Sequence, residues 1–514
     1  MQRKIEPNIP RLIWLDQGNT GKIALRVRFE LTRCDAPLVI LSRHRAGDLK
    51  TSAVGRLATS ALLSVCFLLV LLSLAITSGW FLYLALSRII FYSFLFSDVP
   101  MLIRDVSVLQ SGQILKGRDI LIRDNKIVEI GRDLKVEDKS EIIDGRGKLA
   151  APGLINCHTH AAMTLLRGYA DDMELKPWLE NKIWPLEAKL NEEDISWGVK
   201  LACLEQIHFG ITCFNDMYLF PDAVAEATKE MGMRAFISGV VFDMRPEFLN
   251  GVEPFVRRWK GDELIIPAVG PHSAYACSEE TLLKEKEIAD RHNAMIHIHL
   301  SETREEVDGF LLSKGKSPVE YLDSLGMLSE RLAAVHCVWL SENDCRLLAE
   351  RKANVVDCTV SNLKLTSGIA PLNTLLKWGV NICLGTDGAS SNNNLSLFEE
   401  MKVTAIVQKN AYHTPAAFSA EQIWRLATDN AYRTFGLDMG LKAGALADLM
   451  LIDLRKPWLC PKTNIISHLV YSMTGGVDTT IINGRVLMRE GIIPGEEKIM
   501  AQAQKRFEDL VQRR

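Results

Sequence analysis

The sequence lacks an excess of charge of either sign, since its 514 residues include 60 Lys and Arg and 63 Asp and Glu, for a formal net charge of -3. A protein that binds nucleic acid usually presents a basic surface to the phosphates. The composition therefore gives no reason to expect nucleic acid as a partner. Hydrophobic residues make up 47% of the chain, which is enough for a large core and more than one domain.

Closely spaced cysteine pairs are also missing. The 11 cysteines are scattered between Cys34 and Cys460, with no Cys-x-x-Cys motif and no compact disulfide framework. Such usage is typical of reduced thiols inside a cell. We therefore expect the catalytic region to be cytoplasmic.

The N-terminal part of the chain differs from the rest. Residues 1–56 are basic and irregular, and residues 57–97 form an apolar segment in which Arg88 is the only charge. The stretch Ala61–Leu86 is long enough to cross a bilayer, with its basic flank in the cytoplasm. Taken literally, this segment predicts a membrane anchor.

Three interpretations of the apolar segment remain open. A single span would place everything after it outside the cell, which conflicts with reduced cysteines. A helical hairpin turning near Gly79 would return the chain to the cytoplasm, but its legs would be short and one would carry Arg88. Alternatively, Met101 is the natural start and the extension is a start-site artefact. We give equal weight to the interpretation as a membrane anchor and to the interpretation as a start-site artefact.

The segments 101–150 and 440–514 share a pattern of short alternating strands broken by glycines and charges. The strands expected in the first segment are 102–109, 119–122, 126–130 and 141–144. The pattern returns in Ala447–Asp453 and Thr480–Val486. We therefore expect both segments to form one small composite β domain.

Between them, residues 151–439 alternate buried apolar strands with amphipathic helices, which is typical of α/β units around a parallel sheet. Eight strands are expected, at 153–156, 211–215, 234–238, 264–269, 295–300, 332–336, 354–358 and 381–385. Helix starts are indicated at Asn191 and Ser278. This pattern predicts a TIM-type (β/α)8 barrel.

Histidines and acidic residues lie at the ends of five expected strands. They are His158 and His160 on the first, His272 on the fourth, His297, His299 and Glu302 on the fifth, His336 on the sixth and Asp387 on the eighth. Because the carboxyl ends of barrel strands meet at one face, we expect these side chains to form one site.

The strand ends supply a set of metal ligands. The expected ligands are His158, His160, His299 and Asp387. Residues two apart in a strand point to the same side, so both first-strand histidines can bind one ion, while Cys157 should face away and pack in the core. This ligand set suits Zn²⁺, with iron or another divalent metal as an alternative.

Two further observations concern the metal site. His297 should lie deeper in the barrel than His299 and support the site rather than bind the ion. The fourth-strand stretch 264–272 contains no lysine that could bridge two ions. We therefore expect a single metal.

A single metal with an open position produces hydroxide near neutral pH. Asp387 can take up a proton from the water, His336 can orient the attacking hydroxide, and Glu302 can carry protons to the leaving group. This combination favours hydrolytic attack on a C–N bond of an aromatic ring, with ammonia leaving.

Four stretches resemble the amidohydrolase superfamily, and most closely its branch of 5-methylthioadenosine/S-adenosylhomocysteine deaminases and chlorohydrolase-like enzymes. They are Pro152–His160, Leu165–Gly168, His299–Glu302 and Gly385–Asn392, and the resemblance extends from about Met101 to the C-terminus. It implies a zinc enzyme that replaces the adenine 6-amino group of these nucleosides by oxygen.

The resemblance also implies substrate contacts. Glu187 matches a glutamate that binds the ribose hydroxyls, and His272 matches a substrate-binding histidine; Glu302 and Asp387 would also contact the substrate. One departure is the stretch Phe236–Val241, which has no arginine where some members contact the substrate. How the amino-acid tail of S-adenosylhomocysteine would be held is therefore open.

Other functions remain as alternatives. A related deaminase or chlorohydrolase could act on guanine, an oxidised purine or a triazine, although the ribose-binding role of Glu187 would be useless for a free base. A catalytically inactive, membrane-tethered binding protein is a third hypothesis. We also expect a small-molecule nucleoside as partner, a homo-oligomer, and a membrane contact only if residues 57–97 form a real span.

Overall fold

The computed structural model describes residues 15–17, 23–25, 99–136 and 139–513. The chain divides into two compact units, Met1–Ser97 and Asp98–Arg514. In the first unit, β1 (Leu15–Gln17) pairs antiparallel with β2 (Ile23–Leu25). The apolar segment expected at 57–97 lies outside the described residues. Within the described part of the chain, no helix combines the length and apolarity needed to cross a bilayer.

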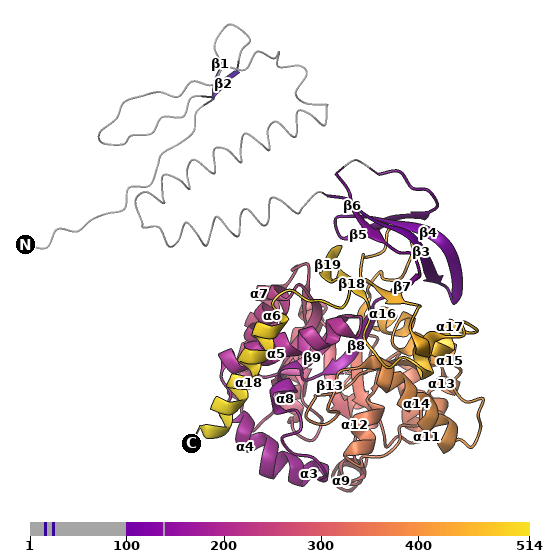
Figure 1. Ribbon diagram of the computed structural model, residues 1–514. Helices are drawn as coiled ribbons and strands as arrows, with labels where there is room; N and C mark the ends of the chain where they lie inside the picture. The colour runs from indigo at the N-terminus through magenta and orange to yellow at the C-terminus, as the bar shows by residue number, and fades with distance from the viewer. Residues whose placement is uncertain (1–14, 18–22, 26–98, 137–138, 514) are drawn as a thin grey trace, which may run out of the picture. The chain divides into compact units, whose positions relative to one another are not determined.

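The second unit contains a small β sheet built from both of its ends (Figure 1), as expected from the shared strand pattern. The first end contributes β3 (Met101–Gln110), β4 (Gln113–Arg123), β5 (Lys126–Gly131), β6 (Glu141–Asp144) and β7 (Lys148–Pro152), and the second contributes β17 (Leu449–Asp453), β18 (Thr479–Ile482) and β19 (Arg485–Met488). The strand order is β19-β18-β17-β7-β3-β4-β5, with β6 beside β3.

Strand β7 was not expected, and it joins the strands from the two ends of the second unit. It pairs parallel with β3 and antiparallel with β17, where Met450 lies opposite Ala151. Its sequence runs directly into the first barrel strand, with only Gly153 between them. The sequence pattern alone therefore did not separate the two strands.

The stretch Thr480–Val486 forms a hairpin of two short strands. Strands β18 and β19 are joined by Asn483 and Gly484, which have φ values of 53° and 73°. Positive φ at both central residues is characteristic of a tight hairpin turn, and Asn-Gly is its preferred sequence.

All eight expected barrel strands are present, which confirms the predicted α/β barrel. They are β8 (Leu154–Thr159), β9 (Ile211–Tyr218), β10 (Arg234–Val241), β11 (Ile265–Pro267) continued by β12 (Gly270–Pro271), β13 (Ile296–Leu300), β14 (Leu332–His336), β15 (Asn354–Asp357) and β16 (Asn381–Leu384). Parallel bridges from Val269 to Ile296 and from Ser273 to His299 join the halves on one side. On the other side, the Asp387 amide donates to the His158 carbonyl at 3.0 Å.

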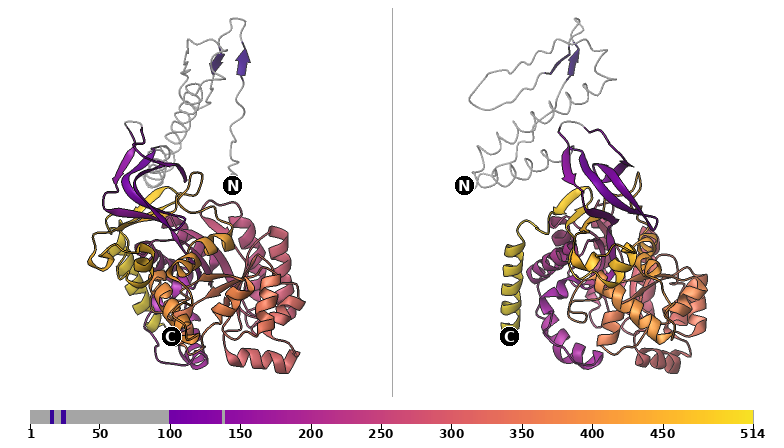
Figure 2. Two further views of the ribbon diagram at one scale, coloured as in Figure 1. Left: turned by 90° about the vertical axis from the view of Figure 1, so that its right-hand side faces the viewer. Right: turned by 45° about the vertical axis from the view of Figure 1, so that its right-hand side comes forward.

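Helices surround the barrel strands (Figure 2). They are α3 (Leu175–Trp178), α4 (Trp184–Glu187), α5 (Glu192–His208), α6 (Pro221–Glu230), α7 (Glu247–Trp259), α8 (Glu279–His292), α9 (Arg304–Lys314), α10 (Pro318–Ser324), α11 (Glu342–Glu350), α12 (Thr359–Lys364), α13 (Leu372–Trp378), α14 (Leu397–Ala411), α15 (Ala420–Leu426), α16 (Asp429–Phe435), α17 (Ile465–Tyr471) and α18 (Glu496–Gln512). The predicted starts are confirmed, because Asn191 caps α5 and Ser278 caps α8.

A bulge in β8 corrects the expected orientation of Cys157. Asn156 pairs with Phe214 and Thr159 with Asp216, so β8 advances by three residues where β9 advances by two. The extra residue interrupts the alternation of side chains. Cys157 therefore packs inside the barrel against a cluster that includes Cys213, Cys358 and Cys383, rather than on the outer face. Its assignment as a buried core thiol is nevertheless confirmed.

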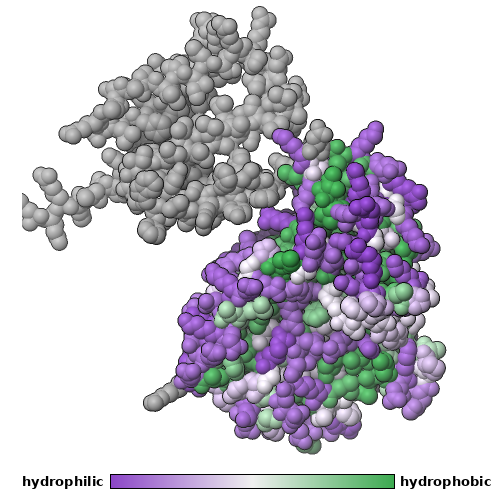
Figure 3. All heavy atoms as spheres, in the orientation of Figure 1, coloured by the Kyte–Doolittle hydropathy of each residue, from purple (hydrophilic) through white to green (hydrophobic). Residues whose placement is uncertain are grey.

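The surface is mainly hydrophilic on the face shown in Figure 3, where apolar side chains gather in a few patches. One of these patches lies on the small β sheet, in which Val128 and Ile142 are exposed. The main apolar core lies beneath this surface, between the barrel strands and the surrounding helices.

Candidate active site

The four expected ligands converge at the carboxyl ends of three barrel strands. His158 lies in β8 and His160 directly follows it, His299 lies in β13, and Asp387 follows β16. Asp387 Oδ1 lies 3.2 Å from His158 Nε2 and 3.3 Å from His160 Nε2. His158, His299 and His336 also bring one nitrogen each to within 4.8 Å of one another. The barrel therefore gathers these groups around one point.

Hydrogen bonds on the far side of each ring fix the orientation of the histidines. His160 Nδ1 donates to the Met217 carbonyl at 2.6 Å, and His299 Nδ1 donates to the His272 carbonyl at 2.8 Å. Such contacts select the tautomer that leaves Nε2 free as an acceptor or ligand. His297 Nε2 lies 2.7 Å from His158 Nδ1, so His297 contacts a neighbouring ring from deeper in the barrel.

Burial keeps most of these rings uncharged. It lowers the pKa of His158 to about 3 and that of His272 to about 4, and it lowers the pKa of His299 well below the ordinary value. Burial opposes the charged form of His160 as well, but contact with Asp387 raises its pKa to about 9. Neutral imidazoles are the form that binds metal ions.

Asp387 remains ionised despite its burial. Burial favours its protonated form, but the nitrogens of His158 and His160 hold its pKa well below the usual range. The other carboxylate oxygen, Oδ2, accepts hydrogen bonds from Ser361 Oγ at 2.6 Å and from Ser391 Oγ at 2.9 Å. These two hydroxyls fix the plane of the carboxylate.

Glu302 and His336 face one another beside these groups. His336 Nε2 lies 3.8 Å from Glu302 Oε2, and Ser367 Oγ donates to Glu302 Oε1 at 3.4 Å. Only 8% of Glu302 is exposed, and burial raises its pKa. The backbone amides of Ser301 and Glu302 both donate to the Glu306 carboxylate, which fixes the loop after β13.

Helix α12 adds two residues that were not expected at the site. Ser361 contacts Asp387, and Asn362 Oδ1 accepts a hydrogen bond from His336 Nδ1 at 2.8 Å. The Asn362 amide in turn donates to Asp357 Oδ1 at 3.1 Å. The seventh strand ends without a histidine, so its contribution was missed. The polar pair Ser361-Asn362 soon after that strand was the available signal.

The two residues implied to contact substrate also lie at this end of the barrel. The His272 ring is 4.7 Å from the His299 ring, measured between centroids. Glu187, at the end of α4, accepts a hydrogen bond from the Tyr218 hydroxyl at 2.6 Å, and the Tyr218 ring lies 6.0 Å from that of His160. All of the site residues predicted from the sequence therefore lie at the carboxyl end of the barrel.

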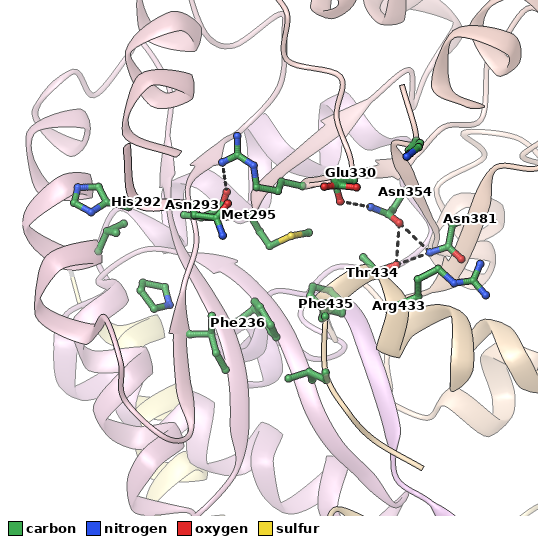
Figure 4. A pocket seen from close by; sticks show the side chains of 18 of the residues that line it. Phe236, His292, Asn293, Met295, Glu330, Asn354, Asn381, Arg433, Thr434 and Phe435 are labelled. Carbon is green, nitrogen blue, oxygen red and sulfur yellow. Dashed lines mark hydrogen bonds between the residues drawn. The ribbon is translucent and has the colours of Figure 1, made fainter. Parts of the chain in front are cut away.

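A separate cavity of about 680 Å³ opens at the opposite end of the barrel (Figure 4). It is lined by residues near the beginnings of strands, including Phe236, Met295, Asn354 and Asn381. Asn381 Nδ2 donates to Asn354 Oδ1 at 2.9 Å along its wall. None of the site residues predicted from the sequence lines this cavity.

The chain is similar to proteins of one known family. The profile of the amidohydrolase family matches residues 149–487. A 5′-deoxyadenosine deaminase from Methanothrix thermoacetophila is 62% identical over 411 residues, which cover 80% of this chain and 99% of that protein. A 5-methylthioadenosine/S-adenosylhomocysteine deaminase from Pelotomaculum thermopropionicum is 44% identical over 413 residues, covering 78% of this chain and 95% of that protein.

Among solved structures, an adenosine deaminase from Xanthomonas campestris with bound zinc is similar over 81% of this chain and 99% of that one, with a TM-score of 0.77 and 31% identity. The profile match covers more than half of the chain, and the relatives are matched over nearly their whole length. The chain belongs to the amidohydrolase family.

Proposed function

We propose that the protein is a hydrolytic deaminase of adenine nucleosides modified at the 5′ position. Its substrates are 5′-deoxyadenosine, 5-methylthioadenosine or S-adenosylhomocysteine, and water replaces the 6-amino group to give the inosine analogue and ammonia. The observation that carries the proposal is the convergence of His158, His160, His299 and Asp387 with Glu302 at one barrel mouth. The activities in the names of the similar proteins support it.

The side chains fit one divalent metal ion, for which we propose zinc. Among the described residues, no group forms a hydrogen bond with the buried His158 Nε2, although Asp387 Oδ1 lies 3.2 Å away, so both atoms are free to bind one ion. His158, His160, His299 and Asp387 would hold the ion, a nitrogen and oxygen set that suits zinc. When bound, such an ion acidifies water, so that hydroxide is available near neutral pH.

The protein's own groups handle the protons. Ionised Asp387 takes a proton from the attacking water, and His336, fixed by Asn362, orients the nucleophile. Burial raises the pKa of Glu302, which favours a carboxyl that can donate to a ring nitrogen. Once it has given up that proton, the Glu302 carboxylate, which lies beside His336, can take the remaining proton of the added water and pass it to the amino group, which leaves as ammonia.

Two residues bind the substrate in this proposal. The carboxylate of Glu187 accepts hydrogen bonds from the ribose hydroxyls, and His272 contacts the nucleoside near the metal ligands. A free base or a triazine carries no ribose hydroxyl that Glu187 could bind. The homo-oligomer, the cytoplasmic location, and the domain limits at 101–150, 151–439 and 440–514 stay predictions.

Ammonia release from the zinc-loaded protein tests the proposal. The panel contains 5′-deoxyadenosine, 5-methylthioadenosine, S-adenosylhomocysteine, adenosine, guanine and a chlorotriazine. The nucleosides should react, whereas turnover of only guanine or the triazine would replace the proposed function by one of the alternatives.

A variant at Glu302 tests its assigned role. Glu302→Gln should keep the metal content and lose about 100-fold to 10,000-fold in ammonia release, as expected for a general acid–base group. The matched control is Glu305→Gln, an exposed carboxylate three residues further along the chain. Normal turnover by the Glu302 variant would exclude the proton-transfer role.

A further inference from the structure

We infer that Tyr218 is a positioning residue that makes Glu187 select nucleosides carrying both the 2′- and 3′-hydroxyls of ribose. This inference rests on the proposed function, because it concerns the sugar end of the same site. It assigns to the end of β9 the discrimination between ribonucleosides and their 2′,3′-dideoxy counterparts.

The geometry connects Tyr218 to Glu187 directly. The Tyr218 hydroxyl donates to Glu187 Oε1 at 2.6 Å, within the range of a short hydrogen bond to a carboxylate. Tyr218 is 4% exposed and lies at the end of β9, whereas Glu187 is half-buried at the end of α4. A rigid strand therefore fixes a carboxylate that comes from a short helical segment.

This contact leaves one carboxylate oxygen of Glu187 available. Among the described residues, no group donates a hydrogen bond to Glu187 Oε2. An ionised carboxylate has about four lone-pair sites, so this oxygen can accept from two neighbouring hydroxyls. A vicinal diol fits such an acceptor, and a sugar without those hydroxyls would leave it unpaired.

Charge favours the same arrangement. Burial raises the pKa of Glu187, while the hydrogen bond from Tyr218 acts in the opposite direction and supports the carboxylate. Burial and the nearby Glu187 charge raise the pKa of the Tyr218 hydroxyl well above its ordinary value, so Tyr218 stays protonated and remains a donor. Tyrosine therefore helps to maintain the acceptor that the diol needs.

The end of β9 that carries Tyr218 also orients an expected metal ligand. The preceding residue, Met217, accepts the hydrogen bond from His160 Nδ1 through its carbonyl. One strand end thus fixes both an expected metal ligand and the orientation of the sugar-binding carboxylate. The effect of Tyr218 on sugar binding must be distinguished from an effect on His160.

The experiment compares two substrates in the zinc-loaded full-length protein, 5′-deoxyadenosine and 2′,3′,5′-trideoxyadenosine. In Tyr218→Phe, the KM for 5′-deoxyadenosine should rise about tenfold, with kcat changed by less than about twofold. The kcat/KM for the trideoxy analogue should stay within about twofold of the wild type. Adding Tyr218→Phe to Glu187→Gln should change KM by no more than about twofold further.

The matched control is Tyr321→Phe. Tyr321 is also largely buried, and its hydroxyl donates to Glu279 at 3.2 Å. Neither partner belongs to the site, so this variant should behave like the wild type with both substrates. The comparison shows whether loss of a buried tyrosine hydroxyl is sufficient to change KM.

Three results would overturn the inference: an unchanged KM in Tyr218→Phe, an equal loss with both substrates, or a fall in kcat with loss of metal. The last two would indicate a structural role through His160. A wild-type protein that releases no ammonia from 5′-deoxyadenosine would instead contradict the proposed function. Calorimetric binding of the two nucleosides would still test Tyr218 in that case, with about tenfold weaker binding of the ribonucleoside alone as the supporting result.

Discussion

At the residue scale, the orientation of His336 depends on Asn362. The Asn362 side chain accepts from His336 Nδ1 and donates to Asp357, so one amide connects the imidazole to a buried carboxylate. Groups that orient a catalytic or metal-bound histidine typically change activity or affinity by about 10-fold to 100-fold when removed. Asn362→Ala should therefore lower kcat by about 10-fold to 100-fold and leave the metal content unchanged.

Ammonia release and metal analysis on the same preparation check this prediction. Asn343→Ala is the control, because Asn343 is an exposed amide on α11. Wild-type turnover by the Asn362 variant would show that His336 keeps its orientation without this contact.

Also at the residue scale, the contribution of Glu285 on α8 to the stability of the fold depends on pH. Its side chain is fully buried, neither carboxyl oxygen has a hydrogen-bond partner in the part of the chain that the structure describes, and burial raises its pKa well above the ordinary value. The folded protein therefore holds this proton to higher pH than the unfolded chain does. The associated stability is complete below the unfolded pKa of about 4.3 and is lost as the pH rises through the folded pKa.

Glu285→Gln should remove this dependence. Relative to the wild type, the variant should gain free energy of unfolding as the pH rises above about 5, at no more than about 1.4 kcal/mol per pH unit. Denaturant unfolding at several pH values measures the gain, and Glu287→Gln, exposed on the same helix, serves as control. A difference that does not vary with pH would contradict the assignment.

At the scale of single elements, the hairpin of β18 and β19 requires a glycine at its turn. Gly484 has a φ of 73°, and a Cβ added there would lie 1.8 Å from the Asp124 carbonyl oxygen. Gly484→Ala should therefore destabilise the protein by about 2–4 kcal/mol. Gly491→Ala is the control, since Gly491 has a φ of 75° but open space around it, and should cost only about 1 kcal/mol. Equal melting temperatures for the two variants would exclude the steric argument.

Element positions also explain which parts of the structure could be predicted. The barrel strands followed from periodicity, and so did the expected metal ligands, because polar groups at parallel strand ends must meet. Glu187 followed only from the family resemblance, since it lies in α4 rather than at a strand end. The inward position of Cys157 did not follow, since the β8 bulge depends on pairing with β9. Ser361 and Asn362 were missed because a helix after β15, rather than the strand itself, brings them to Asp387 and His336.

At the scale of the whole molecule, a buried ion pair connects the barrel to the small β sheet. Arg234, at the start of β10, donates to Asp448 at 2.8 Å and to Asn483 at 3.1 Å. The Arg234 and Asp448 side chains are only 4% and 0% exposed. Removing one partner of such a pair leaves an uncompensated charge and typically costs about 3–5 kcal/mol.

Arg234→Met should therefore lower the free energy of unfolding by about 3–5 kcal/mol. The double variant Arg234→Met with Asp448→Asn should regain part of that loss, because no buried charge is left unpaired. Calorimetric melting of the wild type and the two variants measures both effects. A single variant that is as stable as the wild type would show that water reaches Asp448 once the arginine is gone.

The composite sheet has a consequence for the order in which the protein can fold during translation. Strand β7 is synthesised before all eight barrel strands. Its antiparallel partner β17 is synthesised only after the last of them. Until then, one edge of β7 has no neighbour to satisfy its backbone groups. Strands β3 to β7 are therefore made before the barrel, and the sheet is complete only when β17, β18 and β19 have been made after it.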